Sequence, residues 1–159
     1  MTRPLAFAPI LLLMMLTACG GSSPGPTSPS APVSFLAGTW RGTVTIEVNP
    51  GDPSAVPSSS GTTQWTFETV PNSNQQAFQT TVQSDHMWLR MTTTATTSLT
   101  PTGSPPTQIS THGQFDSPRG CRGTFGSVGT ATTSRIEADF TGTDCQQATF
   151  IGRIVLTKL

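Results

Sequence analysis

The stretch that decides the fold is Gly38-Thr39-Trp40-Arg41-Gly42-Thr43-Val44-Thr45-Ile46-Glu47-Val48, because apolar and polar side chains alternate along it. Successive side chains of a β-strand point to opposite faces, so a period of two predicts a strand with one face on a core and the other in water. The predicted inward face holds Trp40, Gly42, Val44, Ile46 and Val48.

Shorter segments with the same alternation recur as far as Leu159, and Pro, Gly, Asn and Ser separate them. No helical period of 3.6 residues is found among them. Eight strands in up-and-down order predict an all-β, closed antiparallel barrel, which leaves no exposed edge; a two-sheet β-sandwich is the alternative. The further strands are expected near residues 65–69, 78–82, 87–91, 109–115, 120–126, 134–141 and 148–157, with long loops over 49–61 and 101–106. The threonine-rich run 92–97 is compatible with a continuing strand or a bent edge.

Composition limits the size and the partners of the protein. A chain of 159 residues is enough for one domain of ordinary size. Eight basic residues balance eight acidic ones, and only 10% of all residues are charged. Nucleic-acid binding is not expected, because it requires a strongly basic surface.

The N-terminus predicts export and a lipid anchor. Arg3 and the apolar stretch 5–16 are typical of a signal peptide, and the stretch is too short to span a bilayer comfortably. The segment Leu16-Thr17-Ala18-Cys19 resembles the bacterial lipobox, in which the cysteine thiol receives a diacylglycerol and becomes the first mature residue. Because Gly20 follows the cysteine, the resemblance favours the outer membrane of the bacterial cell envelope.

Three regions are therefore expected along the chain. Residues 1–18 form the signal peptide and residues 19–34 a lipidated, disordered tether rich in Pro, Gly and Ser. Residues 35–159 form the barrel domain. The membrane, reached through the lipid on Cys19, is the one partner that the sequence predicts directly.

Two cysteines remain once Cys19 carries the lipid. Cys121 and Cys145 are then an even pair in an oxidising compartment, so we expect them to form one disulfide. A metal or catalytic pair is disfavoured because no Cys-x-x-Cys spacing is present and no histidine lies beside either cysteine.

At the start of the first strand, Gly38-Thr39-Trp40 resembles the Gly-x-Trp signature of lipocalin-type barrels. The resemblance implies that Trp40 plugs one end of the barrel and that a basic residue near the final strand, Arg153 or Lys158, packs over it. The chain departs from that family because it has no tyrosine and no evident helix after the barrel.

Catalytic chemistry is not predicted. The two histidines are His86, beside Asp85 in a predicted turn, and His112, close to Asp116. Neither stands in a catalytic or metal-binding spacing, and the Asp85-His86 pair is expected to be a solvated turn. We expect no enzyme activity, no cofactor and no metal.

Two functions remain open at this point. In the first, the barrel binds a small apolar ligand in an interior lined by Trp65, Phe67, Phe78, Met87, Leu89, Met91, Phe115 and Phe150. In the second, the same side chains fill a packed barrel, which then serves as an envelope scaffold or protein-interaction module. Trp88 lies on the opposite face of its predicted strand and is a candidate for partner contact.

Overall fold

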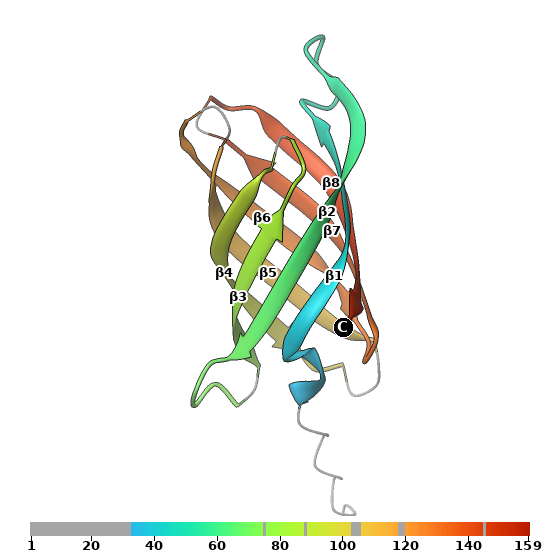
Figure 1. The fold of residues 1–159 in the computed structure, drawn as a ribbon, viewed down its shortest axis with the longest axis vertical. Helices are drawn as coiled ribbons and strands as arrows, with labels where there is room; N and C mark the ends of the chain where they lie inside the picture. The colour runs from blue at the N-terminus through green and yellow to red at the C-terminus, as the bar shows by residue number, and fades with distance from the viewer. Residues whose placement is uncertain (1–32, 75, 88, 103–105, 118–119, 145) are drawn as a thin grey trace, which may run out of the picture.

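The computed structural model describes residues 33–74, 76–87, 89–102, 106–117, 120–144 and 146–159, which form a closed antiparallel barrel. Each strand pairs with the next, and the last pairs with the first (Figure 1). The predicted eight-stranded up-and-down barrel is therefore confirmed, and the sandwich alternative is wrong. Within the described ranges, no helix is long and apolar enough to cross a membrane. The elements are a 3-10 helix Val33–Leu36 (η1) and the strands Gly38–Val48 (β1), Val56–Thr69 (β2), Ala77–Ser84 (β3), Met91–Thr100 (β4), Thr107–Asp116 (β5), Arg122–Ala131 (β6), Arg135–Thr143 (β7) and Thr149–Lys158 (β8).

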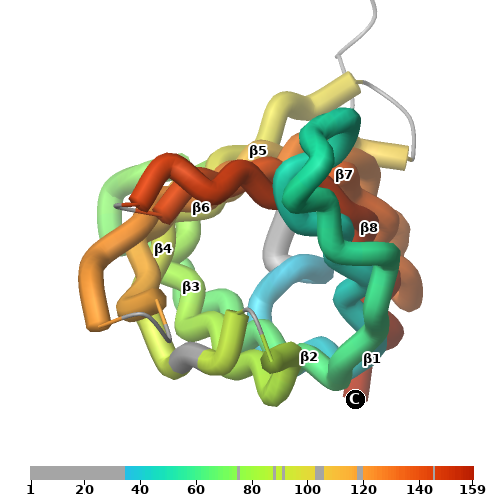
Figure 2. The backbone as a smooth tube through the Cα atoms, turned by 90° about the horizontal axis from the view of Figure 1, so that it is seen from above, coloured from blue at the N-terminus to red at the C-terminus, as the bar shows by residue number. Residues whose placement is uncertain are grey.

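The strands are staggered around the wall. A row of paired residues that starts at Gly38 in β1 passes through every strand and returns to β1 at Val48, ten residues further along. Such a stagger tilts the strands against the barrel axis, as Figure 1 shows. Seen end-on in Figure 2, the eight strands form one ring. A ring of eight strands encloses room for its own side chains or for one small ligand.

Two glycines allow β1 and β8 to approach each other closely. A Cβ atom on Gly42 would lie 1.9 Å from the carbonyl oxygen of Val155, and one on Gly152 would lie 1.9 Å from that of Thr45. No larger residue fits at either position without moving the backbone. Glycines at such points let strongly coiled strands close a small barrel.

The β1–β2 hairpin is longer than predicted. The expected loop 49–61 is wrong in its second half, because β2 begins at Val56 and pairs with the end of β1. The residues from Pro57 to Ser60 are polar or small on both faces, so this part of the strand carries no alternating signal. Figure 1 shows this hairpin projecting past the rim.

The fourth strand also starts later than predicted. It runs from Met91 to Thr100, so the threonine run forms the strand itself and turns Ala95, Thr97 and Leu99 inward. Threonine is β-branched and therefore suits a strand well. Met87 lies before this strand, in the β3–β4 connection.

The two ends of the barrel differ. Helix η1 and the end of β8 lie together at one end, which we call the closed end (Figure 1). The β1–β2 hairpin and the β3–β4, β5–β6 and β7–β8 connections lie at the other end, which we call the far rim. Helix η1 begins at Val33, two residues inside the segment expected to be tether.

Candidate functional site

Trp40 lies at the closed end with its side chain fully buried. Its indole Nε1 donates a hydrogen bond to the carbonyl oxygen of Leu36, 2.8 Å away. Its ring meets the Phe67 ring edge-to-face, with 6.5 Å between the centroids. These contacts tie η1 to the core, so Trp40 and Leu36 together fill this end of the barrel.

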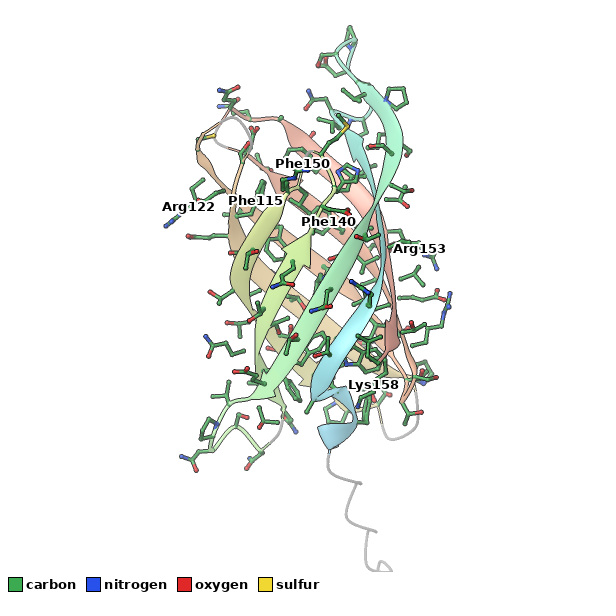
Figure 3. The ribbon with its side chains drawn as sticks, in the orientation of Figure 1. Phe115, Arg122, Phe140, Phe150, Arg153 and Lys158 are labelled. Atoms are coloured by element: carbon green, nitrogen blue, oxygen red, sulfur yellow. The ribbon has the colours of Figure 1, made fainter. Side chains whose placement is uncertain are left out.

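The basic residue over Trp40 is Lys158. Its Nζ lies 5.4 Å from the centroid of the indole ring and donates to the carbonyl oxygen of Phe35. Arg153, the other candidate, lies on the outer wall, where its guanidinium pairs with Glu137 (Figure 3). Arg135 pairs with the same carboxylate, and hydrogen bonds from both arginines hold the pKa of Glu137 below its ordinary value.

Most of the predicted ligand-binding residues lie in the interior. Six of them are at most 2% exposed and point into the barrel: Trp65, Phe67, Phe78, Leu89, Phe115 and Phe150. The placement of Met87 in the interior is wrong, since this side chain is 68% exposed in the β3–β4 connection. The side chain of Met91 lies outside the described part of the structure.

Two further aromatic side chains of the interior were not among the candidates. Phe125 and Phe140 are buried and stacked on each other, with ring centroids 5.7 Å apart. Phe115 and Phe150 pack edge-to-face beside them at 6.0 Å, toward the far rim (Figure 3). The β-strand alternation of residues 123–131 is the signal for Phe125, but glycines occupy two of its five inward positions and weaken that signal.

On β5 and β6, two aromatic rings cover two glycines reciprocally. Phe125 is paired with Gly113 across the ladder, and Phe115 is paired with Gly123. A Cβ atom on Gly113 would lie 2.6 Å from Phe125 Cε1, and one on Gly123 would lie 2.6 Å from Phe115 Cζ. Each ring therefore occupies the volume that a side chain would take on the opposite strand.

The wall next to these rings has a gap in its hydrogen-bond ladder. Strands β4 and β5 pair from Thr100↔Gln108 only as far as Ala95↔Gly113, although both strands continue toward the far rim. Beyond that point, the hydroxyl of Thr93 donates to the carbonyl oxygen of Gln114 in place of a backbone bond. We call this gap the lateral slot.

Inward-facing and outward-facing residues meet at the lateral slot. A hollow of about 510 Å³ opens there from the outside of the barrel. Residues of both faces of the sheet contribute to its lining, but the inward-facing Ala95 and Phe115 are only 6% and 1% exposed, so the hollow ends at these side chains. The residues that line it are Val70, Phe78, Gln79, Thr93, Thr94, Ala95, Thr96, His112, Gly113, Gln114, Phe115, Asp116 and Arg122.

Below the slot, the interior contains hydroxyl groups. The Thr80 and Thr97 hydroxyls are hydrogen-bonded at 2.7 Å, and the Thr97 and Thr111 hydroxyls at 2.8 Å. All three side chains are fully buried. Two hydrogen bonds link the three hydroxyls across β3, β4 and β5, and each hydroxyl has at least one partner, which lowers the cost of burial in an apolar interior.

The predicted Asp85-His86 turn is only half solvated. Asp85 is exposed, and its carboxylate accepts hydrogen bonds at 2.7 Å from the hydroxyl and the backbone N–H of Thr62, which lower its pKa. His86 corrects the expectation because it is 2% exposed. Its Nε2 lies 3.0 Å from both the hydroxyl and the carbonyl oxygen of Ser59. The long β2 strand covers this histidine and removes it from water.

The other polar candidates lie on the outer wall. His112 is exposed and hydrogen-bonded to Ser110, and Asp116 is paired with Arg122 at 3.6 Å. In the part of the chain that the structure describes, no group of three or more His, Cys, Asp or Glu residues is placed to hold a metal ion. Three predicted features lie outside the described residues. They are the lipobox with most of the tether (residues 1–32), the partner-contact candidate Trp88, and Cys145 of the predicted disulfide.

Fold and site together define an eight-stranded antiparallel barrel with a lateral slot and an aromatic interior. No protein-family model matches the chain, and no curated protein is significantly similar to it. Among solved structures, the chain is similar to one described as "Structure of EF1p2_mFAP2b bound to DFHBI", with a TM-score of 0.53 and 13% sequence identity. The match covers 80% of this chain and 97% of that one. At this identity, the likeness extends to the barrel fold.

Proposed function

We propose that the protein is a lipid-anchored component of the bacterial cell envelope whose barrel binds a small, mainly apolar ligand, and that it is not an enzyme. The lateral slot is the observation that carries the ligand-binding part of this proposal. The β4–β5 ladder ends there at Ala95 and Gly113, next to the place where Phe115 and Phe125 lie over glycines. Apolar and aromatic side chains are the usual lining of ligand pockets.

Binding in the interior requires these rings to move. Phe115 and Phe125 are at most 3% exposed, so they fill the space behind the slot in the absence of a ligand. Rotation of either ring away from its glycine would free a space of about the size of the ring, into which another aromatic group could fit. The neighbour of the same fold that is described as bound to DFHBI supports a barrel of this size as a ligand binder.

The proposed anchor and the slot lie toward opposite ends of the barrel. The proposed tether runs into η1 at the closed end, where Trp40 and Lys158 seal the barrel. The slot lies toward the far rim, between the upper parts of β4 and β5. A barrel tethered to a membrane by its closed end therefore keeps its slot away from the lipid. The closed end with Gly38-Thr39-Trp40 and a cation over the indole also supports a lipocalin-like architecture.

A cross-link across the slot tests the route of the ligand. We would replace Thr94 and Gln114, which both face outward, by cysteines in one variant and join them with a bifunctional thiol reagent. The probe is N-phenyl-1-naphthylamine, which fluoresces in apolar surroundings. We expect the uncross-linked protein to bind it saturably and the cross-link to slow its association at least tenfold.

The matched control joins Gln64→Cys and Gln83→Cys, which face outward across the intact β2–β3 ladder. This cross-link should leave the association rate unchanged. Equal rates in both cross-linked variants would show that the slot is not the route, and absence of saturable binding would overturn the ligand-binding proposal.

A second candidate function is a packed envelope scaffold or protein-interaction module. The near-complete burial of the interior aromatics favours it, because a barrel filled by its own side chains needs no ligand. In that case the far rim, with its projecting β1–β2 hairpin, is the surface presented to a partner. Absence of saturable probe binding would leave this function.

A further inference from the structure

We propose that the ligand of the barrel is a flat, uncharged molecule with a hydrogen-bond acceptor such as a carbonyl group, and that the hydroxyl of Ser127 donates to that acceptor. This inference rests on the proposed ligand-binding function and specifies the chemical class of the ligand. It follows from the order of the inward-facing residues on β5 and β6.

The inward-facing pairs of these two strands change from aromatic residues with glycines to residues with hydroxyl groups along the barrel. From the far rim toward the closed end they are Phe115/Gly123, Gly113/Phe125 and Thr111/Ser127. Successive inward positions on a strand are about 7 Å apart. The hydroxyl pair therefore lies one step below the ring that covers Gly113, at the depth that a molecule displacing Phe125 would reach.

Ser127 has unused hydrogen-bonding capacity there. Its side chain is 2% exposed, and its Oγ has no hydrogen-bond partner among the described residues. Thr111, its partner across the ladder, ends the chain of hydroxyls that starts at Thr80. The two bonds of that chain use two of its three hydroxyl protons. Ser127 and the threonine chain together thus have hydroxyl donors without an acceptor, and a buried donor without an acceptor destabilises the fold.

The charge of the ligand follows from what surrounds this position. The buried side chains of the described residues include no lysine or arginine. A carboxylate or phosphate in this interior would lack a cation to offset its desolvation. A neutral acceptor is satisfied by one or two hydroxyl donors, whereas a pure hydrocarbon would leave Ser127 unpartnered.

Two probes of the same shape test the inference. 2-Acetylnaphthalene has a carbonyl oxygen where 2-isopropenylnaphthalene has a CH2 group. Titration of the full chain, with a protein-free blank of the same buffer and lipid or detergent, gives both dissociation constants. We expect the ketone to bind about tenfold more tightly, which is the ratio for one neutral hydrogen bond of about 1.4 kcal/mol.

The variant Ser127→Ala should remove this preference and retain binding of the hydrocarbon. The control Ser110→Ala removes a hydroxyl from the outer face of β5 and should keep the tenfold ratio. Equal affinity of the native protein for both probes, or an unchanged ratio in Ser127→Ala, would overturn the inference and leave the ligand-binding function standing. Failure of both probes to bind would overturn the proposed function itself. The urea midpoint of each variant verifies that it is folded.

Discussion

The ring of Phe125 lies against the backbone of Gly113 on the neighbouring strand, where a Cβ atom would approach the ring to 2.6 Å. Because Gly113 is also the last residue of β5 that pairs with β4, this contact lies at the edge of the lateral slot. The position of one ring thus links the packing of the interior with the opening in the wall.

The replacement Gly113→Ala should destabilise the barrel. Its methyl group would overlap the Phe125 ring and lie 2.8 Å from the Ala95 side chain, and overpacking of this kind costs about 1–3 kcal/mol. Urea unfolding followed by tryptophan fluorescence measures the loss. The control is Gly126→Ala on the outer face, whose nearest neighbour is His112 Nδ1 at 3.3 Å, with an expected change within about 0.5 kcal/mol. Equal stability of the two variants would contradict tight packing at Gly113.

Trp40 should contribute much more to stability than the cation that covers it. Trp40→Ala removes a fully buried indole and its hydrogen bond to Leu36, at a cost of about 3–5 kcal/mol. Lys158→Met keeps the aliphatic part of the side chain and removes an exposed cation–π contact, at a cost of about 0.5–1 kcal/mol. Thermal unfolding ranks the two variants. If Lys158→Met cost as much as Trp40→Ala, the indole would not be the main contact at the closed end.

Strands over the core were predictable because one of their faces is apolar. Strand β1 shows this in full, since Trp40, Val44, Ile46 and Val48 all point inward. The beginning of β2 was not predictable, because Pro57 to Ser60 are polar or small on both faces and do not alternate. In β4 the inward residues include Thr97, which is hydrogen-bonded to other threonines. Because this inward residue is polar, the sequence alone did not indicate that one face of the strand is buried.

The site was less predictable than the fold. Aromatic candidates such as Phe67 and Phe115 were found because period-two alternation places them inward. The lateral slot depends on where the β4–β5 ladder stops, a relation between strands that no single stretch of sequence contains. The burial of His86 likewise depends on the distant residue Ser59. Contacts of this kind are set by the stagger of the closed barrel.

The pKa of Asp85 should depend on Thr62. The Thr62 hydroxyl and N–H both donate to the carboxylate and hold its pKa below the ordinary value of about 3.9. A lowered pKa in the folded state stabilises the fold above that value, and this contribution is lost as the pH falls through the folded-state pKa. In Thr62→Val the pKa should rise toward the ordinary value, as followed by NMR titration of the carboxyl carbon. Thr94→Val, on another strand, should leave it unchanged.

Cys121 and Cys145 should be disulfide-linked in the exported protein. Cys121 comes three positions before Thr124 and Cys145 two positions after Thr143, and these two threonines are the last pair of the β6–β7 ladder toward the far rim. Closing a loop of about 24 residues stabilises a fold by about 3 kcal/mol. Thiol labelling of the denatured, unreduced protein should find both cysteines blocked, and labelling after reduction should find both free. Labelling of Cys121 without reduction would rule out the bridge.

The lipid anchor at Cys19 should determine where the protein resides. Native protein from the producing cells should enter the detergent phase of a phase-separation experiment, because a lipidated cysteine carries long acyl chains. The comparison variant replaces residues 16–19 with an ordinary signal-peptidase site, so that the chain is exported without lipid and should stay in the aqueous phase. Simple Cys19→Ala is a weaker test, since an uncleaved apolar segment would itself hold the chain in the membrane. The intact mass of the N-terminal peptide should show a modified Cys19 as its first residue. A native chain that stays in the aqueous phase with an unmodified Cys19 would disprove the anchor, while the barrel, its slot and its interior hydroxyls would be unaffected.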